Sequence, residues 1–153
     1  MMYYTHLVFS ILCGLLFLDA FYISHAWIFL LIVAICSFIP DIDNYKSKVG
    51  RKLPIISHII NFIFGHRKIF HSLLVPIVIL ILGYLFNFVF VGWAFFVGFV
   101  SHLIGDSFTK EGINFLYPFN LRISGFFKTG SFIESLLFVI IFVIDVVLVL
   151  RLI

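Results

Sequence analysis

The chain has 153 residues, of which 63% are hydrophobic and only 11% are charged, and its formal net charge is +3. A soluble domain carries about 25% charged residues, so this composition excludes an ordinary soluble protein and predicts one integral membrane domain over residues 1–153. The apolar runs are broken by Gly, Asn and Pro without strict alternation, which favours membrane helices over a β-barrel.

Two membrane helices are predicted near the N-terminus, at residues 7–22 and 26–39. Both are short, since a bilayer core about 30 Å thick takes about 20 helical residues. A proline disfavours helix at the preceding residue and so marks the end of the second helix. Asp41 and Asp43 follow at alternate positions, and in an extended chain alternate side chains point the same way. We therefore expect the two carboxylates to converge, although a solvated helix end is an alternative interpretation.

The segment after the next polar loop, residues 53–64, is apolar but too short to span the membrane. It suits an interfacial or re-entrant helix. Two histidines and two cations stand between it and a third predicted span at residues 73–86: His66, Arg67, Lys68 and His71. The two cations between the histidines are placed to bind phosphate, or to form a basic collar at the membrane surface.

The fourth predicted span, residues 93–106, ends with His102 and Asp106. On an α-helix this spacing of four places both side chains on one face, about one turn apart. An imidazole and a carboxylate arranged in this way can hold a divalent metal ion. A hydrogen-bonded His–Asp pair at the water interface is the alternative.

The last span is predicted at residues 131–150, after a loop at residues 110–130 that is broken by Gly and Pro. Glu134 lies near the start of this span. The fold class predicted from the sequence is therefore all-α, a polytopic membrane bundle of about five spans with a metal site at one helix-end face.

Counting the crossings places most polar residues on one side of the membrane. All of the ten Lys and Arg residues except Arg151 fall on that side, which the positive-inside rule assigns to the cytoplasm of a multi-pass cell (inner) membrane protein. Independent interfacial His and Asp residues would scatter over both faces. The predicted metal ligands are His6, Asp41, Asp43, His66, His71, His102 and Asp106. They suffice for one or two ions, and imidazole with carboxylate suits zinc, with manganese or iron as alternatives.

A set of short motifs runs in order over about residues 5–135. The motifs are His6, Pro40-Asp41-Ile42-Asp43, Lys46-Ser47, Gly65-His66-Arg67, His71-Ser72 and Ser101-His102-x3-Asp106-x2-Thr109-x2-Gly112, with Tyr117-Pro118 after it. This set resembles that of the YdjM/YbcI-type membrane-bound metal-dependent hydrolases. That family is distantly similar to zinc-dependent phospholipases C and fungal single-strand nucleases, which hold clustered zinc ions with an early His, an Asp, a further His and a His-x3-Asp.

The resemblance implies a specific ligand set. It contains His6, one of Asp41 and Asp43, one or both of His66 and His71, and His102 with Asp106. The later His-x3-Glu ligands of the soluble enzymes have no match here, because Glu134 follows no His, so a third zinc is not expected.

These observations predict a membrane-bound, metal-dependent hydrolase of a phosphoester, such as a phospholipid or another lipid-linked phosphate. A bound metal lowers the pKa of water towards neutrality, and Asp41 or Asp43 orients or deprotonates that water. Arg67 and Lys68 are predicted to bind the phosphate. Supporting residues around the ligands are predicted to be Ser72, Ser101, Thr109 and Glu134.

Two other functions fit the same residues. A metal-ion or proton transporter usually has its site near the bilayer midplane, whereas these ligands cluster at span ends. A non-catalytic membrane protein with a structural metal would have a closed, four-coordinate site. The predicted partners are the lipid bilayer and a phosphate-containing lipid or small substrate, and no nucleic acid is predicted.

Overall fold

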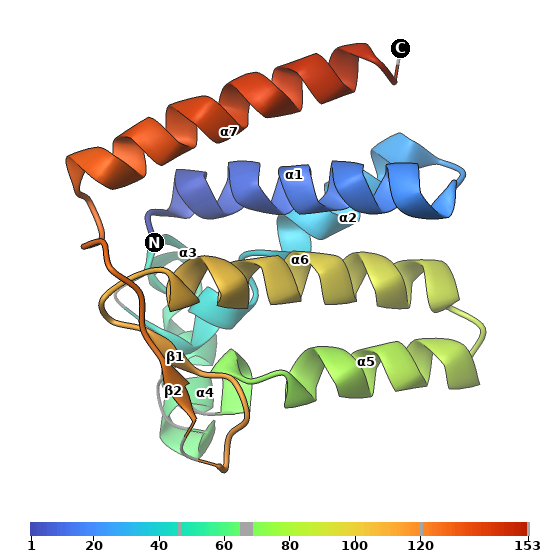
Figure 1. Cartoon of the computed structure of the whole chain (residues 1–153). Coiled ribbons are helices and arrows are strands. Elements are labelled where there is room, and N and C mark those ends of the chain that lie inside the picture. The colour runs from blue at the N-terminus through green and yellow to red at the C-terminus, as the bar shows by residue number, and fades with distance from the viewer. Residues whose placement is uncertain (46, 65–68, 120, 153) are drawn as a thin grey trace.

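The computed structural model describes residues 1–45, 47–64, 69–119 and 121–152. Its main body is a bundle of helices in which α1, α5 and α6 run side by side and α7 slants across α1 (Figure 1). The helices of this bundle are α1 (Tyr3–Phe21), α2 (Ala26–Cys36), α5 (Leu74–Leu85), α6 (Val89–Ser107) and α7 (Phe132–Leu150). The prediction of a helical membrane bundle is thereby confirmed.

Four segments of the described chain are long and apolar enough to cross a membrane. They are Tyr3–Phe21, Ala26–Asp43, Val89–Ser107 and Phe132–Leu150. The predicted third span, α5, is apolar but has only 12 residues, fewer than the roughly 17 that a span needs. It nevertheless packs along α6 as a full member of the bundle (Figure 1).

The centre of the bundle is α6, which packs against α1, α2 and α5, while α7 packs on α1. Gly98 permits the close approach of α6 to α2, because a Cβ atom there would collide with the backbone oxygen of Val33. Such small residues at helix interfaces are typical of membrane bundles. The apolar core between α1, α2 and α6 contains Leu15, Leu18, Phe29, Leu30, Val33, Ala94 and Val97.

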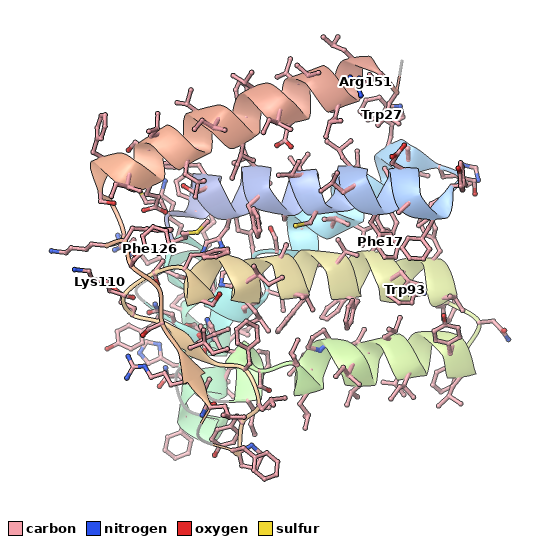
Figure 2. All side chains as sticks on the ribbon, in the orientation of Figure 1. Phe17, Trp27, Trp93, Lys110, Phe126 and Arg151 are labelled. Atoms are coloured by element: carbon pink, nitrogen blue, oxygen red, sulfur yellow. The ribbon has the colours of Figure 1, made fainter. Side chains whose placement is uncertain are left out.

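The irregular segments gather at one end of the bundle, beside the N-terminus, and the C-terminus lies at the opposite end (Figure 1). They comprise the 3-10 turns η1 (Pro40–Asp43) and η2 (Ile69–His71), the helices α3 (Lys48–Lys52) and α4 (Pro54–Phe64), and the strands β1 (Ile113–Asn114) and β2 (Arg122–Ile123). The two strands form an antiparallel ribbon in which Ile113 pairs with Ile123. Lys110 extends from this end, and Arg151 lies at the other (Figure 2).

Two local expectations change in the structure. The Asp41–Asp43 segment is not extended, because Pro40 stands at the start of a 3-10 turn, where its fixed φ suits helical backbone. The α6 helix begins at Val89, four residues before the predicted start at residue 93. The predicted short helix at residues 53–64 is present as α4, which packs against η1.

Candidate metal centre

His102 and Asp106 lie in the last two turns of α6, and both are buried. The helix places them on one face, as their spacing predicted. Nε2 of His102 lies 3.7 Å from Oδ2 of Asp106, so the two side chains face the same small space.

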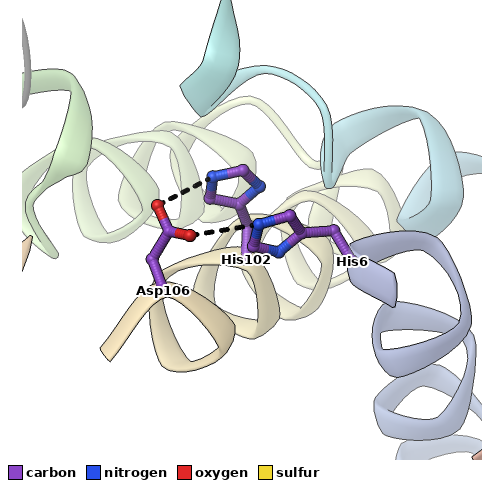
Figure 3. Close-up of side chains that lie close together, drawn as sticks. All are labelled: His6, His102 and Asp106. Atoms are coloured by element: carbon purple, nitrogen blue, oxygen red, sulfur yellow. Dashed lines mark hydrogen bonds and ion pairs between the residues drawn. The ribbon is translucent and has the colours of Figure 1, made fainter. Parts of the chain in front are cut away.

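His6 enters this space from the first turns of α1. Its ring stacks on that of His102, with centroids 3.9 Å apart and an interplanar angle of 10°. Its Nε2 lies 3.1 Å from Oδ1 of Asp106, so that one carboxylate contacts both imidazoles (Figure 3). Gly105 makes room for the ring, since a Cβ atom there would lie 3.1 Å from Nδ1 of His6.

His71 and Asp43 come from the two 3-10 turns and form a buried pair. Nδ1 of His71 lies 3.2 Å from Oδ2 of Asp43. A carboxylate can only accept, so this contact selects the tautomer of the neutral ring in which Nδ1 donates and Nε2 presents a lone pair. That Nε2 lies 3.8 Å from Oδ2 of Asp106. A carboxylate behind the far nitrogen is the usual arrangement of a metal-binding histidine, because it fixes the tautomer and the ring orientation.

Asp41 and Asp43 therefore take different places, although both reach the cluster. Oδ1 of Asp41 lies 4.0 Å from Nε2 of His102, and its side chain is 24% exposed. The 3-10 turn sends Asp43 behind His71 instead, where it is fully buried. The predicted convergence of the two carboxylates on one point is thus wrong, because it assumed an extended chain.

The donor atoms form two overlapping groups. His6, His102 and Asp106 make one, and Asp41, His71 and His102 make the other, with the ligand atoms of each group within 4.8 Å of one another. Both ring nitrogens of His102 are buried and have no hydrogen-bond partner among the residues that the structure describes. An unpaired buried polar atom costs about 1–3 kcal/mol, so this ring is suited to a further partner. A nitrogen and carboxylate donor set of this kind fits a zinc-type divalent ion.

Asp106 also contacts a cation in this structure. The amino nitrogen of Met1 lies 2.6 Å from Oδ1 of the carboxylate. The oxygens of Asp106 thus face the imidazoles of His6, His71 and His102 as well as this amino group.

Three of the predicted supporting hydroxyls bond to nearby backbone. Ser72 donates to the carbonyl of Ile69 at 2.7 Å, and Ser101 donates to Gly98 at 2.7 Å. Thr109 donates to the carbonyl of Asp106 at 2.8 Å. These bonds stabilise the turns that carry His71, His102 and Asp106.

Glu134 supports the cluster from α7. Its buried carboxylate accepts hydrogen bonds from the backbone N–H groups of Met2 and Gly130, each at 2.6 Å. It thereby ties the start of α1 to the start of α7.

Three predicted residues, His66, Arg67 and Lys68, lie outside the described residues, so their predicted roles stay predictions. His25 is not among the predicted ligands, and it stands directly before α2, where its side chain makes no capping hydrogen bond. The turn between α1 and α2 lies at the end of the bundle opposite the N-terminus (Figure 1).

A polar cavity of about 230 Å³ opens beside the cluster. Its lining includes Asp41, Asp106, Lys48, Glu111 and Thr129. The last three were not singled out from the sequence. In the sequence, the hint to Lys48 is its position directly after Ser47 of the Lys46-Ser47 motif. The Ser47 side chain accepts a hydrogen bond from the N–H of Gly50 at 2.9 Å and thereby caps the start of α3 beside η1.

Comparison with known proteins identifies the family. The chain matches the model of the YdjM inner membrane protein family over residues 1–152. The chain belongs to the YdjM family. The sequence-based resemblance to the YdjM/YbcI type is thereby confirmed.

Two relatives illustrate the range of the YdjM family. The chain is 38% identical over 109 residues to the uncharacterized protein YvsG of Bacillus subtilis. This alignment covers 67% of the present chain and 66% of YvsG. The chain is 34% identical over 130 residues to the inner membrane protein YdjM of Escherichia coli, covering 76% of this chain and 65% of that one. The matched region thus spans just under two thirds of each relative. No solved structure matches the chain, and the similarity to phospholipases C and nucleases stays a prediction.

Proposed function

We propose that this membrane protein is a metal-dependent hydrolase of phosphoesters. The observation that carries the proposal is the pair of donor groups that share His102, held by α1, α6 and the two 3-10 turns beside a polar cavity. Donors from four separate segments meet at one point, which is the arrangement of a site and not of a helix cap.

The proposed ligands are His6, His71, His102, Asp41 and Asp106, around one or two divalent ions. Zinc fits the donors best, with manganese or iron as alternatives. When bound, such an ion acts as a Lewis acid and lowers the pKa of water towards neutrality.

The protein residues supply the rest of the chemistry. Hydrolysis forms a bond from a water oxygen to phosphorus and breaks the ester P–O bond. Asp41, at the edge of the polar cavity, is placed to accept a proton from that water and return it to the leaving oxygen. Asp43 is a positioning residue that orients His71. Arg67 and Lys68 remain proposed phosphate ligands from the sequence alone.

The proposed site faces the cytoplasm. The reason is the charge distribution among the described residues, since Lys48, Lys52 and Arg122 lie in the irregular segments at the end of the bundle that carries Lys110, whereas Arg151 lies at the opposite end (Figure 2). Single cysteines in a Cys-free background, labelled from outside intact cells, should react at Asn87 and not at Arg122. Labelling of Arg122 from outside would reverse this assignment.

Purified protein offers a direct test of the activity. It should hydrolyse p-nitrophenyl phosphate or bis(p-nitrophenyl) phosphate, lose this activity to a chelator and regain it with zinc. Arg67→Ala should slow turnover while metal content stays normal, because a phosphate contact is lost and no ligand is removed. If fully metal-loaded protein turns over no phosphoester and instead carries metal into proteoliposomes, the proposed hydrolase function is wrong and the protein is a transporter.

A further inference from the structure

A second, larger cavity adjoins the polar one. It has a volume of about 460 Å³, and its lining is mostly apolar, from residues that include Phe38, Val49 and Leu53. Tyr3, Asp41 and Lys48 line both cavities. The polar cavity beside Asp106 and this apolar hollow therefore lie next to each other, with Asp41 and Lys48 on the lining of both.

This apolar hollow continues along α2. A third cavity of about 320 Å³ is lined by residues that include Ile35, Ile39 and Ile42, and it shares Phe38 and Val49 with the second. Ile35 is on the exposed face of α2, which lipid chains would cover in a membrane. Through these shared lining residues the three cavities follow one another from the cluster of carboxylates and histidines to the bilayer-facing side of α2, and we call this row of cavities the path.

Charge is placed where this path changes from polar to apolar. Nζ of Lys48 lies 3.5 Å from the centroid of the Tyr3 ring, a cation–π contact that holds the ammonium group between the two cavities. Lys52 lines the apolar hollow as well. Two cations on the lining of the apolar hollow, one of them also on the lining of the polar cavity, complement an anion that carries a hydrocarbon chain.

We propose that the substrate is a membrane lipid with a phosphate head group, which enters sideways from the bilayer. Its phosphate lies in the polar cavity against Lys48, and one hydrocarbon chain lies in the hollow along α2, past Val49. This inference rests on the proposed function and names the substrate class of the same site. A free phosphate ester would leave the apolar hollow unfilled and would need no opening towards the lipid.

The test uses the whole protein in nanodiscs with a phosphatidic acid whose acyl chain carries a diazirine. After photolysis, labelling should be found on residues 35–42 and 49–53. An excess of unlabelled phosphatidic acid should abolish it, whereas an excess of diacylglycerol with the same chains should not. Labelling on the lipid-exposed face of α7 should fall equally with both competitors, because it reports bulk lipid only.

Matched variants separate the groove from other apolar hollows. Val49→Trp should abolish head-group-dependent labelling. Val91→Trp should leave it unchanged, although Val91 lines a similar hollow of about 310 Å³ between α5 and α6. Lys48→Gln should abolish the difference between phosphatidic acid and diacylglycerol as competitors. Retained zinc binding would show that each variant is folded.

The outcomes distinguish this proposal from the proposed function. If the apolar hollow is labelled specifically but no phosphoester is turned over, the lipid site is supported and the hydrolase function is disproved. Turnover of p-nitrophenyl phosphate, with labelling that both competitors reduce equally, would sustain the hydrolase and overturn the lipid groove. Competition by glycerol 3-phosphate as strong as that by phosphatidic acid would also overturn it, because the hydrocarbon chain would then add nothing.

Discussion

The bundle of α1, α2 and α6 has two buried ends of opposite chemistry. At one end, Leu15 of α1, Phe29 of α2 and Ala94 of α6 pack into an apolar core, and at the other, His6 stacks on His102 beside Asp106. Phe29 is 0% exposed and His102 is 1% exposed, so burial does not distinguish the two ends. In a bilayer, lipid shields an apolar side chain from water almost as well as protein does. A buried ionisable group is costly there and usually indicates a functional site.

This contrast predicts different losses when each end is altered. Changes at the polar end should remove metal from a folded bundle. Changes at the apolar end should loosen the bundle but leave the metal stoichiometry of the folded protein unchanged.

The largest effect is expected from His102→Ala. This ring is the donor common to both groups, so its loss should remove most or all bound metal. Elemental analysis of protein purified without chelator measures the result. His25→Asn is the matched control, because an asparagine tolerates the positive φ of 59° at that position. Equal metal content in the two variants would disprove the shared-donor role of His102.

The next effect is expected from Phe29→Ala in the apolar core. A Phe→Ala cavity costs roughly 3–5 kcal/mol in well-packed cores, so the melting temperature should fall clearly. Metal per folded chain should stay at the wild-type value. Specific loss of metal in this variant, at a temperature where it is folded, would show that the two ends are coupled.

Asp43→Asn should have an intermediate effect. The amide keeps the shape of the side chain but removes the negative charge behind Nδ1 of His71. Loss of such a partner typically lowers metal affinity by about 10–100-fold. Zinc titration against a chromophoric chelator measures the change. If the affinity does not change, Asp43 does not position a ligand.

The smallest effect is expected from Gly105→Ala. The new methyl group would lie 3.1 Å from Nδ1 and 3.2 Å from Cε1 of His6, so the ring must shift by a few tenths of an ångström. Zinc affinity should fall by less than in Asp43→Asn, and the melting temperature should change little. A large fall in stability with unchanged affinity would mean that Gly105 serves helix packing alone.

Much of the helical framework could be predicted from the sequence, because membrane spans are set by length and hydropathy. The pairing of His102 with Asp106 could also be predicted, since it depends only on helix geometry within α6. Counting spans then indicated which polar residues share one end of the bundle.

Other parts of the site depend on contacts between helices. The stacking of His6 on His102 depends on the register of α1 against α6, which Gly105 permits. The division of roles between Asp41 and Asp43 depends on a 3-10 turn that the alternating acids did not reveal. The cavities beside Lys48 arise from the packing of α3 against η1, for which a single sequence has no periodic signal.

Anomalous diffraction at the zinc edge from zinc-saturated protein locates the metal itself. We expect a peak between His6, His102 and Asp106, or between Asp41, His71 and His102, or one peak at each place. A structure at full zinc saturation with no peak at either place, or with its only peak at another part of the chain, would disprove the metal centre.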